Sequence, residues 1–99
     1  MIQAVIIILS TKGRIIEFVL SGKSGKGFPS GLLRAAIRKV AMLEAANRLD
    51  DLRVPPANRL EALRGDRAGQ HSIRINDQWR LCFIWTDNGP EEVELVDYH

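Results

Sequence analysis

Two segments in the second half of the chain alternate between apolar and polar side chains with a period of two, the pattern of β-strands with one buried face. The segments are residues 71–75 and 79–85. Their odd-numbered positions hold His71, Ile73, Ile75, Trp79, Leu81, Phe83 and Trp85. We predict that these side chains face a hydrophobic core and that the even-numbered ones lie on the opposite face.

The pairing of these two strands depends on the length of the loop between them. A two-residue loop at Asn76-Asp77 would place Ile73 beside Arg80 and mix the two faces. A three-residue loop at 76–78 places Ile73 beside Leu81 and keeps the faces separate. We therefore predict the three-residue loop, which also places His71 opposite Phe83 as a hydrogen-bonded core histidine.

The same register makes Arg74 and Arg80 cross-strand neighbours on the face away from the core. Like charges in that arrangement are unfavourable unless an anion lies between them, so the pair suggests an anion site. Five of the twelve acidic residues lie in the last thirteen positions, which leaves residues 1–86 with a net charge of +7. A basic body of this kind suits a polyanion such as nucleic acid, although a solvated surface explains it equally well.

The N-terminal half is expected to contribute a strand and helices. Residues 2–9 form a predicted buried strand, and their apolar run, residues 4–9, is far shorter than the ~20 residues of a membrane helix. Residues 14–20 fit a strand by propensity, although Ile15, Phe18 and Val19 also fit one inner face of a short helix by spacing. The pattern is clearest at 30–48, a helix predicted to begin with Ser30 as N-cap and to bury an apolar stripe through Leu33, Ile37, Val40 and Leu43. Its outer face is basic, with Arg34, Arg38 and Lys39.

Past this helix, Pro55-Pro56 ends any helical pattern, and residues 53–69 are predicted to form a long charged connection. Residues 87–90 are the next predicted turn, and residues 93–96 the last strand.

Several functions are excluded or disfavoured by the residues present. The Gly22-Lys23-Ser24 triplet lacks the upstream glycine of a phosphate-binding P-loop, because Glu17 stands there. The single Cys82 cannot form an intramolecular disulfide, and with two histidines it cannot complete a four-ligand zinc site. We expect one domain spanning residues 1–99, cytosolic, with no metal and no cofactor.

The charged connection and the chain end carry residues suited to acid–base chemistry. Glu61 and His99 could exchange protons, since an imidazole titrates near neutrality and a carboxylate can act as a base. Tyr98, Arg64 and Arg80 add a hydroxyl and two cations. Metal-free RNA cleavage needs a base for the ribose 2′-hydroxyl, an acid for the leaving 5′-oxygen and cations for the developing charge.

Three stretches are specific enough to suggest a family. They are DLRVPPANRLEALRGDR at 51–67, GQHSIRINDQWR at 69–80 and the ending VDYH at 96–99. Together they closely resemble HigB toxins, which belong to the RelE-like superfamily of bacterial toxin–antitoxin systems. The likeness covers residues 23–99.

The resemblance implies a small α+β domain, with two N-terminal helices packed on one face of a mostly antiparallel sheet and a helix at 14–20. It implies a ribosome-dependent endonuclease that cuts mRNA in the ribosomal A site and inhibits translation. It also implies neutralisation by a HigA-like antitoxin with a helix-turn-helix domain, with operator DNA contacted only through that complex, and no membrane. A homologue that binds RNA, ribosome or antitoxin without cutting is the alternative.

The family's catalytic set falls on Asp97, Tyr98 and His99, with Arg64 and Arg80 as its cationic positions. Some HigB proteins carry a catalytic histidine where this chain has Glu61, so the second acid–base partner is open, and Glu61 is its candidate. The candidate catalytic residues are Glu61, Arg80, Asp97, Tyr98 and His99. The candidate RNA- and phosphate-binding residues are Arg64, Arg67, Arg74 and Arg80.

Overall fold

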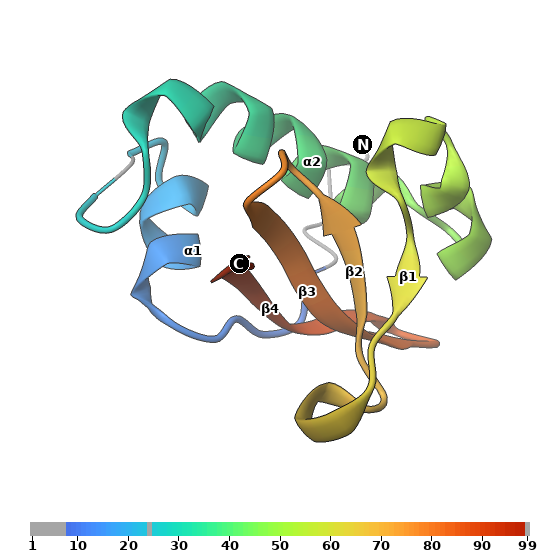
Figure 1. The fold of residues 1–99 in the computed structure, drawn as a ribbon. Coiled ribbons are helices and arrows are strands. Elements are labelled where there is room, and N and C mark those ends of the chain that lie inside the picture. Colours follow the sequence, from blue (N-terminus) through green and yellow to red (C-terminus); the bar gives the residue numbers. More distant parts are fainter. Residues whose placement is uncertain (1–7, 24, 99) are drawn as a thin grey trace, which may run out of the picture.

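A computed structural model describes residues 8–23 and 25–98 and has an α+β fold, as predicted (Figure 1). Its sheet has the order β1-β2-β3-β4, and each neighbouring pair is antiparallel. The strands are β1 Glu61–Ala62, β2 His71–Arg74, β3 Trp79–Thr86 and β4 Gly89–Asp97. The helices are α1 Arg14–Leu20 and α2 Leu33–Ala45, with short 3-10 turns at Ser30–Leu32, Leu49–Arg53, Pro56–Asn58 and Gly65–Arg67.

The predicted register between β2 and β3 is confirmed. Ile73 lies opposite Leu81 and Arg74 opposite Arg80, and the same ladder pairs His71 with Phe83. The Ile75 amide donates to the Trp79 carbonyl at 2.9 Å, which closes the three-residue loop at 76–78. Within the loop, the Asn76 side-chain oxygen accepts hydrogen bonds from the amides of Gln78 and Trp79, at 2.9 and 2.7 Å. These two hydrogen bonds stabilise the turn. This turn sets the register that keeps the apolar and polar side chains of the hairpin on separate faces.

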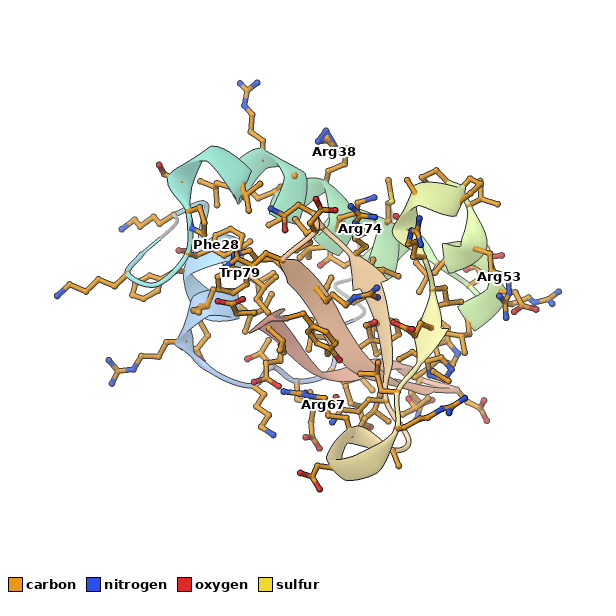
Figure 2. The ribbon with its side chains drawn as sticks, viewed as in Figure 1. Phe28, Arg38, Arg53, Arg67, Arg74 and Trp79 are labelled. Carbon is orange, nitrogen blue, oxygen red and sulfur yellow. The ribbon has the colours of Figure 1, made fainter. Side chains whose placement is uncertain are left out.

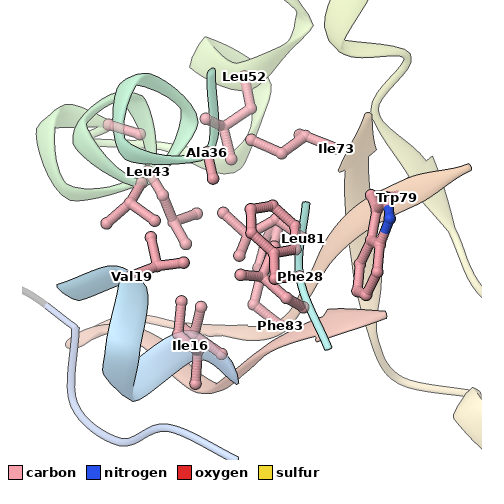
Figure 3. Packing of buried hydrophobic residues seen from close by; sticks show 14 residues of the cluster. Ile16, Val19, Phe28, Ala36, Leu43, Leu52, Ile73, Trp79, Leu81 and Phe83 are labelled. Carbon is pink, nitrogen blue, oxygen red and sulfur yellow. The ribbon is translucent and has the colours of Figure 1, made fainter. Parts of the chain in front are cut away.

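The hydrophobic core is one cluster that contains side chains of both helices and of the sheet (Figure 3). Its buried members include Ile16, Val19, Ala36, Val40, Leu43, Ile73, Leu81, Phe83, Val93 and Leu95. Each large side chain buried here contributes about 1.5 to 3 kcal/mol through removal of apolar area from water. The Trp79 ring meets the Phe28 ring edge-on, with centroids 4.8 Å apart, and so ties the segment before α2 to β3.

Residues 14–20 form helix α1, so the strand favoured by propensity is wrong and the helix implied by the family resemblance is confirmed. Ile16 and Val19, three residues apart, are the buried positions. Phe18 is 38% exposed, although the helical reading of the sequence placed it on the inner face. Burial against the core outweighs the modest β-propensity of such a short segment.

Helix α2 is shorter than predicted, and its buried side is rotated about the helix axis relative to the predicted apolar stripe. Residues 30–32 form a 3-10 turn capped by the backbone at Pro29, so Ser30 is not a side-chain N-cap. The buried positions of α2 are Ala36, Val40 and Leu43. Ile37, predicted to be in the core, is 42% exposed, because the buried stripe runs one residue to its side.

The connection after α2 is more ordered than the sequence indicated. It contains the 3-10 turns and strand β1, which pairs Glu61 with Ser72. The fully buried Asn58 holds it in place: its amide donates to the Leu52 carbonyl at 3.1 Å, and its oxygen accepts a hydrogen bond from Lys39 Nζ at 2.5 Å. A buried amide with several bonds can replace regular secondary structure as the organiser of a segment.

The last hairpin also differs from the expectation. β3 ends at Thr86 and β4 begins at Gly89, so the turn is the pair Asp87-Asn88 rather than residues 87–90. The Leu9 amide donates to the Pro90 carbonyl at 2.8 Å, which places the start of the described chain alongside β4. Most of the strand predicted at 2–9 lies outside the described residues. No helix in the described part of the chain is long and apolar enough to span a membrane.

Candidate active site

Side chains from all four strands meet on the sheet face opposite the core. The register places Glu61 opposite Ser72, Ser72 opposite Cys82, and Cys82 opposite Glu94. Directly opposed residues point to the same face, so these four form one row across the sheet. Ser72 and Cys82 are nevertheless fully buried, because longer side chains lie over them.

Arg80 occupies the centre of this face. Its Nη1 donates to Ser72 Oγ at 2.8 Å, pairs with Glu61 Oε1 at 3.0 Å and approaches the Arg59 carbonyl oxygen at 3.5 Å. The Arg80 side chain is 16% exposed and that of Glu61 is 52% exposed. The guanidinium is therefore held by fixed acceptors, while the carboxylate remains open to solvent.

Tyr98 lies beside Arg80 at the end of β4. The Arg80 Cζ lies 5.6 Å from the centroid of the Tyr98 ring, within the range of a cation–π contact. The Tyr98 amide donates to the Gln78 carbonyl at 2.5 Å, so the backbone of the chain end is anchored to the loop after β2. Tyr98 thus follows β4 directly and is tied to the sheet by this hydrogen bond, as expected from its place after a predicted strand.

Burial and the neighbouring Cys82 thiol raise the pKa of the Tyr98 phenol, while Arg67 and Arg80 act to lower it. Burial also raises the pKa of the Cys82 thiol. Both groups are therefore protonated at neutral pH, and the phenol can donate a hydrogen bond or a proton.

Arg67 reaches the same face from the 3-10 turn after β1. Its Nη1 pairs with Glu94 Oε1 at 3.1 Å and donates to Gln70 Oε1 at 3.0 Å. Burial lowers the pKa of the Arg67 guanidinium, but the hydrogen bond and charge of Glu94, together with Cys82 and Tyr98, raise it, and the net shift is upward. Arg67 is consequently a fixed cation at this site.

The remaining predicted residues take different positions. Arg74 pairs with Asp77, so the two cross-strand arginines each have a carboxylate of the chain itself, and their opposition no longer requires a bound anion. Figure 2 shows Arg74 and Arg67 toward opposite ends of the sheet. Arg64 is exposed. The Asp97 carboxylate accepts a hydrogen bond from Gln78 Nε2 at 3.1 Å, and His99 lies outside the described residues.

His71 differs in part from its prediction as a hydrogen-bonded core histidine. It is half-buried and stacks on Phe83, with ring centroids 6.4 Å apart. Its Nδ1 is buried and finds no hydrogen-bond partner in the described part of the chain. Among residues 8–23 and 25–98, no three His, Cys, Asp or Glu side chains gather as a possible metal site.

Sequence reasoning did not single out Ser72, Cys82 and Glu94 as members of the site. Alternation already placed Ser72 and Cys82 on the face away from the core. Extending the same parity along the last strand would have added Glu94 and Tyr98 to it. The pairing of Arg67 with Glu94 had no signal in the sequence, because it depends on how the segment before β2 folds back.

Comparison with known proteins identifies the family of this chain. Residues 12–99 match the HigB-like toxin family, described as the RelE-like toxin of the type II toxin–antitoxin system HigB. The chain belongs to this family. A HigB-like toxin is the toxin component of a toxin–antitoxin system, and a type II toxin of this kind has an antitoxin partner.

Two relatives illustrate how much of the chain is shared. Toxin HigB-1 of Vibrio cholerae is 44% identical over 71 residues, which cover 72% of this chain and 75% of that protein. An uncharacterized protein of Haemophilus influenzae is 36% identical over 74 residues, covering 75% of this chain and 73% of that protein.

Proposed function

We propose that this HigB-like toxin is an endoribonuclease that cuts mRNA in the A site of translating ribosomes and thereby inhibits translation. The observation that carries the proposal is the cluster of Arg80, Glu61 and Tyr98 on the open face of the sheet. It combines a fixed cation, a solvent-accessible carboxylate and a protonated phenol within one contact network. These are the groups that phosphodiester cleavage by the ribose 2′-hydroxyl requires without a metal.

In the proposed reaction the 2′-oxygen attacks the adjacent phosphorus and the bond from phosphorus to the 5′-oxygen breaks. Glu61 is the candidate base that takes the proton of the 2′-hydroxyl. Tyr98 or His99 gives a proton to the leaving 5′-oxygen. Asp97, which precedes them, is the remaining candidate catalytic residue that the family resemblance implies. Arg80 stabilises the negative charge that grows on the phosphate oxygens. The products are a 2′,3′-cyclic phosphate and a free 5′-hydroxyl.

Four arginines are proposed to bind the RNA backbone: Arg64, Arg67, Arg74 and Arg80. Arg64 is exposed and free to follow a phosphate group. Arg67 and Arg74 are paired with carboxylates of the chain, so they would present only their remaining N–H groups. The arginines therefore differ in role, with Arg80 at the reacting phosphate and the others around it.

The partners follow from the same proposal. The ribosome supplies the A-site mRNA, a HigA-like helix-turn-helix protein is the antitoxin, and operator DNA is reached only through that complex. The site of action is the cytoplasm. The whole chain would act as one RelE-like domain, with both N-terminal helices on one face of the sheet and the RNA on the other.

Purified full-length protein tests this function with a defined mRNA and translating ribosomes. Primer extension should show new 5′ ends at A-site positions when ribosomes are present and none when they are absent. Arg80→Met should abolish these ends. The control Arg53→Met, at an exposed arginine paired with Asp50 away from Arg67 in Figure 2, should retain them.

A homologue that binds without cutting is the second candidate, favoured by the ion pair that engages Glu61 with Arg80. It predicts ribosome binding and translation arrest with intact mRNA. New 5′ ends in the wild-type reaction would exclude it, and their absence would overturn the nuclease proposal.

A further inference from the structure

Ser72 is a fully buried polar side chain within the face that carries the candidate site. Its exposed fraction is 0%, and its hydroxyl oxygen accepts a hydrogen bond from Arg80 Nη1 at 2.8 Å. The register determines this contact, because Ser72 lies opposite Cys82, and Arg80 precedes Cys82 by two residues on the same face of β3. Ser72 and Arg80 are therefore diagonal neighbours on two paired strands, and paired strands hold side chains in place more firmly than loops do.

The contacts of Arg80 are concentrated on one nitrogen of its guanidinium. Within residues 8–23 and 25–98, Ser72 Oγ, Glu61 Oε1 and the Arg59 carbonyl oxygen all contact Nη1. The Ser72 oxygen is the nearest of the three, and unlike the half-exposed Glu61 carboxylate it is shielded from water. Since water competes least for a buried hydrogen bond, Ser72 contributes most to the direction of Nη1.

The other edge of the guanidinium is formed by Nε and Nη2. Their N–H bonds point the same way in the plane of the group, so together they can bind two oxygens of one phosphate. The Tyr98 ring centroid lies 5.6 Å from Arg80 Cζ, which further restricts the group. A guanidinium that is fixed through Nη1 thus offers a phosphate a directed pair of donors instead of a mobile charge.

We propose that Ser72 is a positioning residue for Arg80 and that its hydroxyl directs the Nε and Nη2 edge toward the phosphate that is cleaved. The inference rests on the proposed nuclease function and deepens it. As the 2′-oxygen attacks, negative charge grows on the phosphate oxygens, and donors that already point at them stabilise it without reorganisation. Loss of the Ser72 hydroxyl should therefore affect the transition state more than RNA binding.

Two substitutions of nearly equal shape separate the hydroxyl of Ser72 from its packing. Ser72→Thr keeps the hydroxyl, Ser72→Val replaces it with a methyl group, and both side chains suit a strand. Ser72→Ala removes the hydroxyl without added bulk. The control Ser10→Ala removes a hydroxyl that accepts a hydrogen bond from the Glu92 amide at 2.9 Å. Ser10 lies beside β4, so β3 and β4 separate it from Ser72.

NMR of the full-length protein with isotope-labelled arginine measures how firmly the guanidinium is held, and it needs no RNA. The Arg80 signals are identified by their loss in Arg80→Lys. Rotation about the Nε–Cζ bond of Arg80 should be slow in wild type, Ser72→Thr and Ser10→Ala. It should be about tenfold faster in Ser72→Ala and Ser72→Val, because a hydrogen bond to a charged group is lost.

Cleavage on translating ribosomes gives the second readout. Ser72→Ala and Ser72→Val should lower kcat about tenfold with little change in KM, which is less than the loss of a donor that touches the transition state. Ser72→Thr should restore most of the activity, and Ser10→Ala should leave it unchanged. If Ser72→Ala does not fold, as judged by thermal unfolding, the pair Ser72→Thr and Ser72→Val carries both measurements.

Three results would overturn the inference. Unchanged rotation of the Arg80 guanidinium without the hydroxyl would show that Ser72 does not hold Nη1. Equal losses of kcat in Ser72→Thr and Ser72→Val would assign the effect to packing. A higher KM with unchanged kcat would show that Ser72 acts on RNA binding alone. If wild type does not cut, the nuclease proposal fails and the catalytic role of Ser72 with it, while the rotation rates still decide whether Ser72 holds Arg80.

Discussion

The ion pair between Glu61 and Arg80 allows a quantitative test of the site through protein stability. Arg80→Met removes a guanidinium that bonds to the fully buried Ser72 hydroxyl and to the half-exposed Glu61 carboxylate. Glu61→Gln removes only the carboxylate charge. The two substitutions should therefore have unequal effects on the free energy of unfolding.

The magnitudes follow from exposure and distance. At 3.0 Å the attraction between the two charges is roughly 5 kcal/mol at an effective dielectric constant of about 20. Desolvation of the guanidinium, ordering of two long side chains and solvent around the exposed carboxylate reduce the net coupling to about 1 kcal/mol. Arg80→Met also leaves the Ser72 hydroxyl buried without its donor, for a total cost of about 2 to 3 kcal/mol. We expect about 1 kcal/mol or less for Glu61→Gln.

Urea unfolding followed by tryptophan fluorescence measures these values, since Trp79 is 5% exposed and packs on Phe28. Wild type, both single variants and the double variant complete a double-mutant cycle. The coupling energy should fall when the salt concentration rises to about 1 M, where the screening length shortens to about 3 Å.

Equal losses of unfolding free energy in Arg80→Met and Glu61→Gln would contradict the difference in burial between the two side chains, from which the unequal costs were calculated. A coupling energy that is zero within error would show that the pair does not form in solution.

Three further predictions concern buried groups. Asn58→Ala should lower the free energy of unfolding by about 2 to 3 kcal/mol, because the Leu52 carbonyl and the Lys39 ammonium lose a buried partner. A loss below about 0.5 kcal/mol in urea unfolding would contradict this. The Cys82 thiol, fully buried with a raised pKa, should react with a chromogenic disulfide reagent only as the chain unfolds, and rapid reaction of the native protein would count against its burial. Because the pKa of Tyr98 is raised on folding, the folded state retains that proton longer, so the free energy of unfolding should fall as the pH rises from about 10 through the folded pKa. Tyr98→Phe should flatten this part of the stability profile, and an unchanged slope would assign it to other groups.

The strands that build the site could be predicted from the sequence because alternation with a period of two leaves few registers. A one-residue slip of residues 71–75 against 79–85 would bury Arg80 in place of Leu81. The pairing of Ile73 with Leu81 therefore followed from the requirement that one face be apolar, and the structure confirms it.

Helix positions were less determined, because a short amphipathic segment tolerates rotation. Ile37 and Phe18 fit an inner stripe by spacing, yet both are exposed. The sequence does not show which neighbour covers each helix, and that neighbour decides which of two adjacent stripes is buried.

The site itself was predictable in part. Parity places Arg80 on the face away from the core, and the resemblance pointed to Arg80, Tyr98 and Glu61. The position of Glu61 on that face depends on strand β1, which the sequence did not indicate. The ion pairs were not predictable, since Arg67 with Glu94 and Arg74 with Asp77 depend on side-chain geometry within irregular segments. The ion pairs show which arginines are already engaged by carboxylates of the chain, and residue type alone does not reveal this.

The proposed cleavage of A-site mRNA is tested most directly in a host that lacks the antitoxin. Wild type, His99→Ala and Arg80→Lys would be induced in parallel while growth and mRNA 5′ ends are followed in the same cultures. Arg80→Lys keeps the charge but cannot reproduce the directed N–H groups that reach Ser72 and Glu61. We expect growth arrest and codon-phased 5′ ends with wild type alone. Codon-phased ends of equal abundance in the variants would contradict the assigned site, and arrest by wild type with intact mRNA would contradict the nuclease itself.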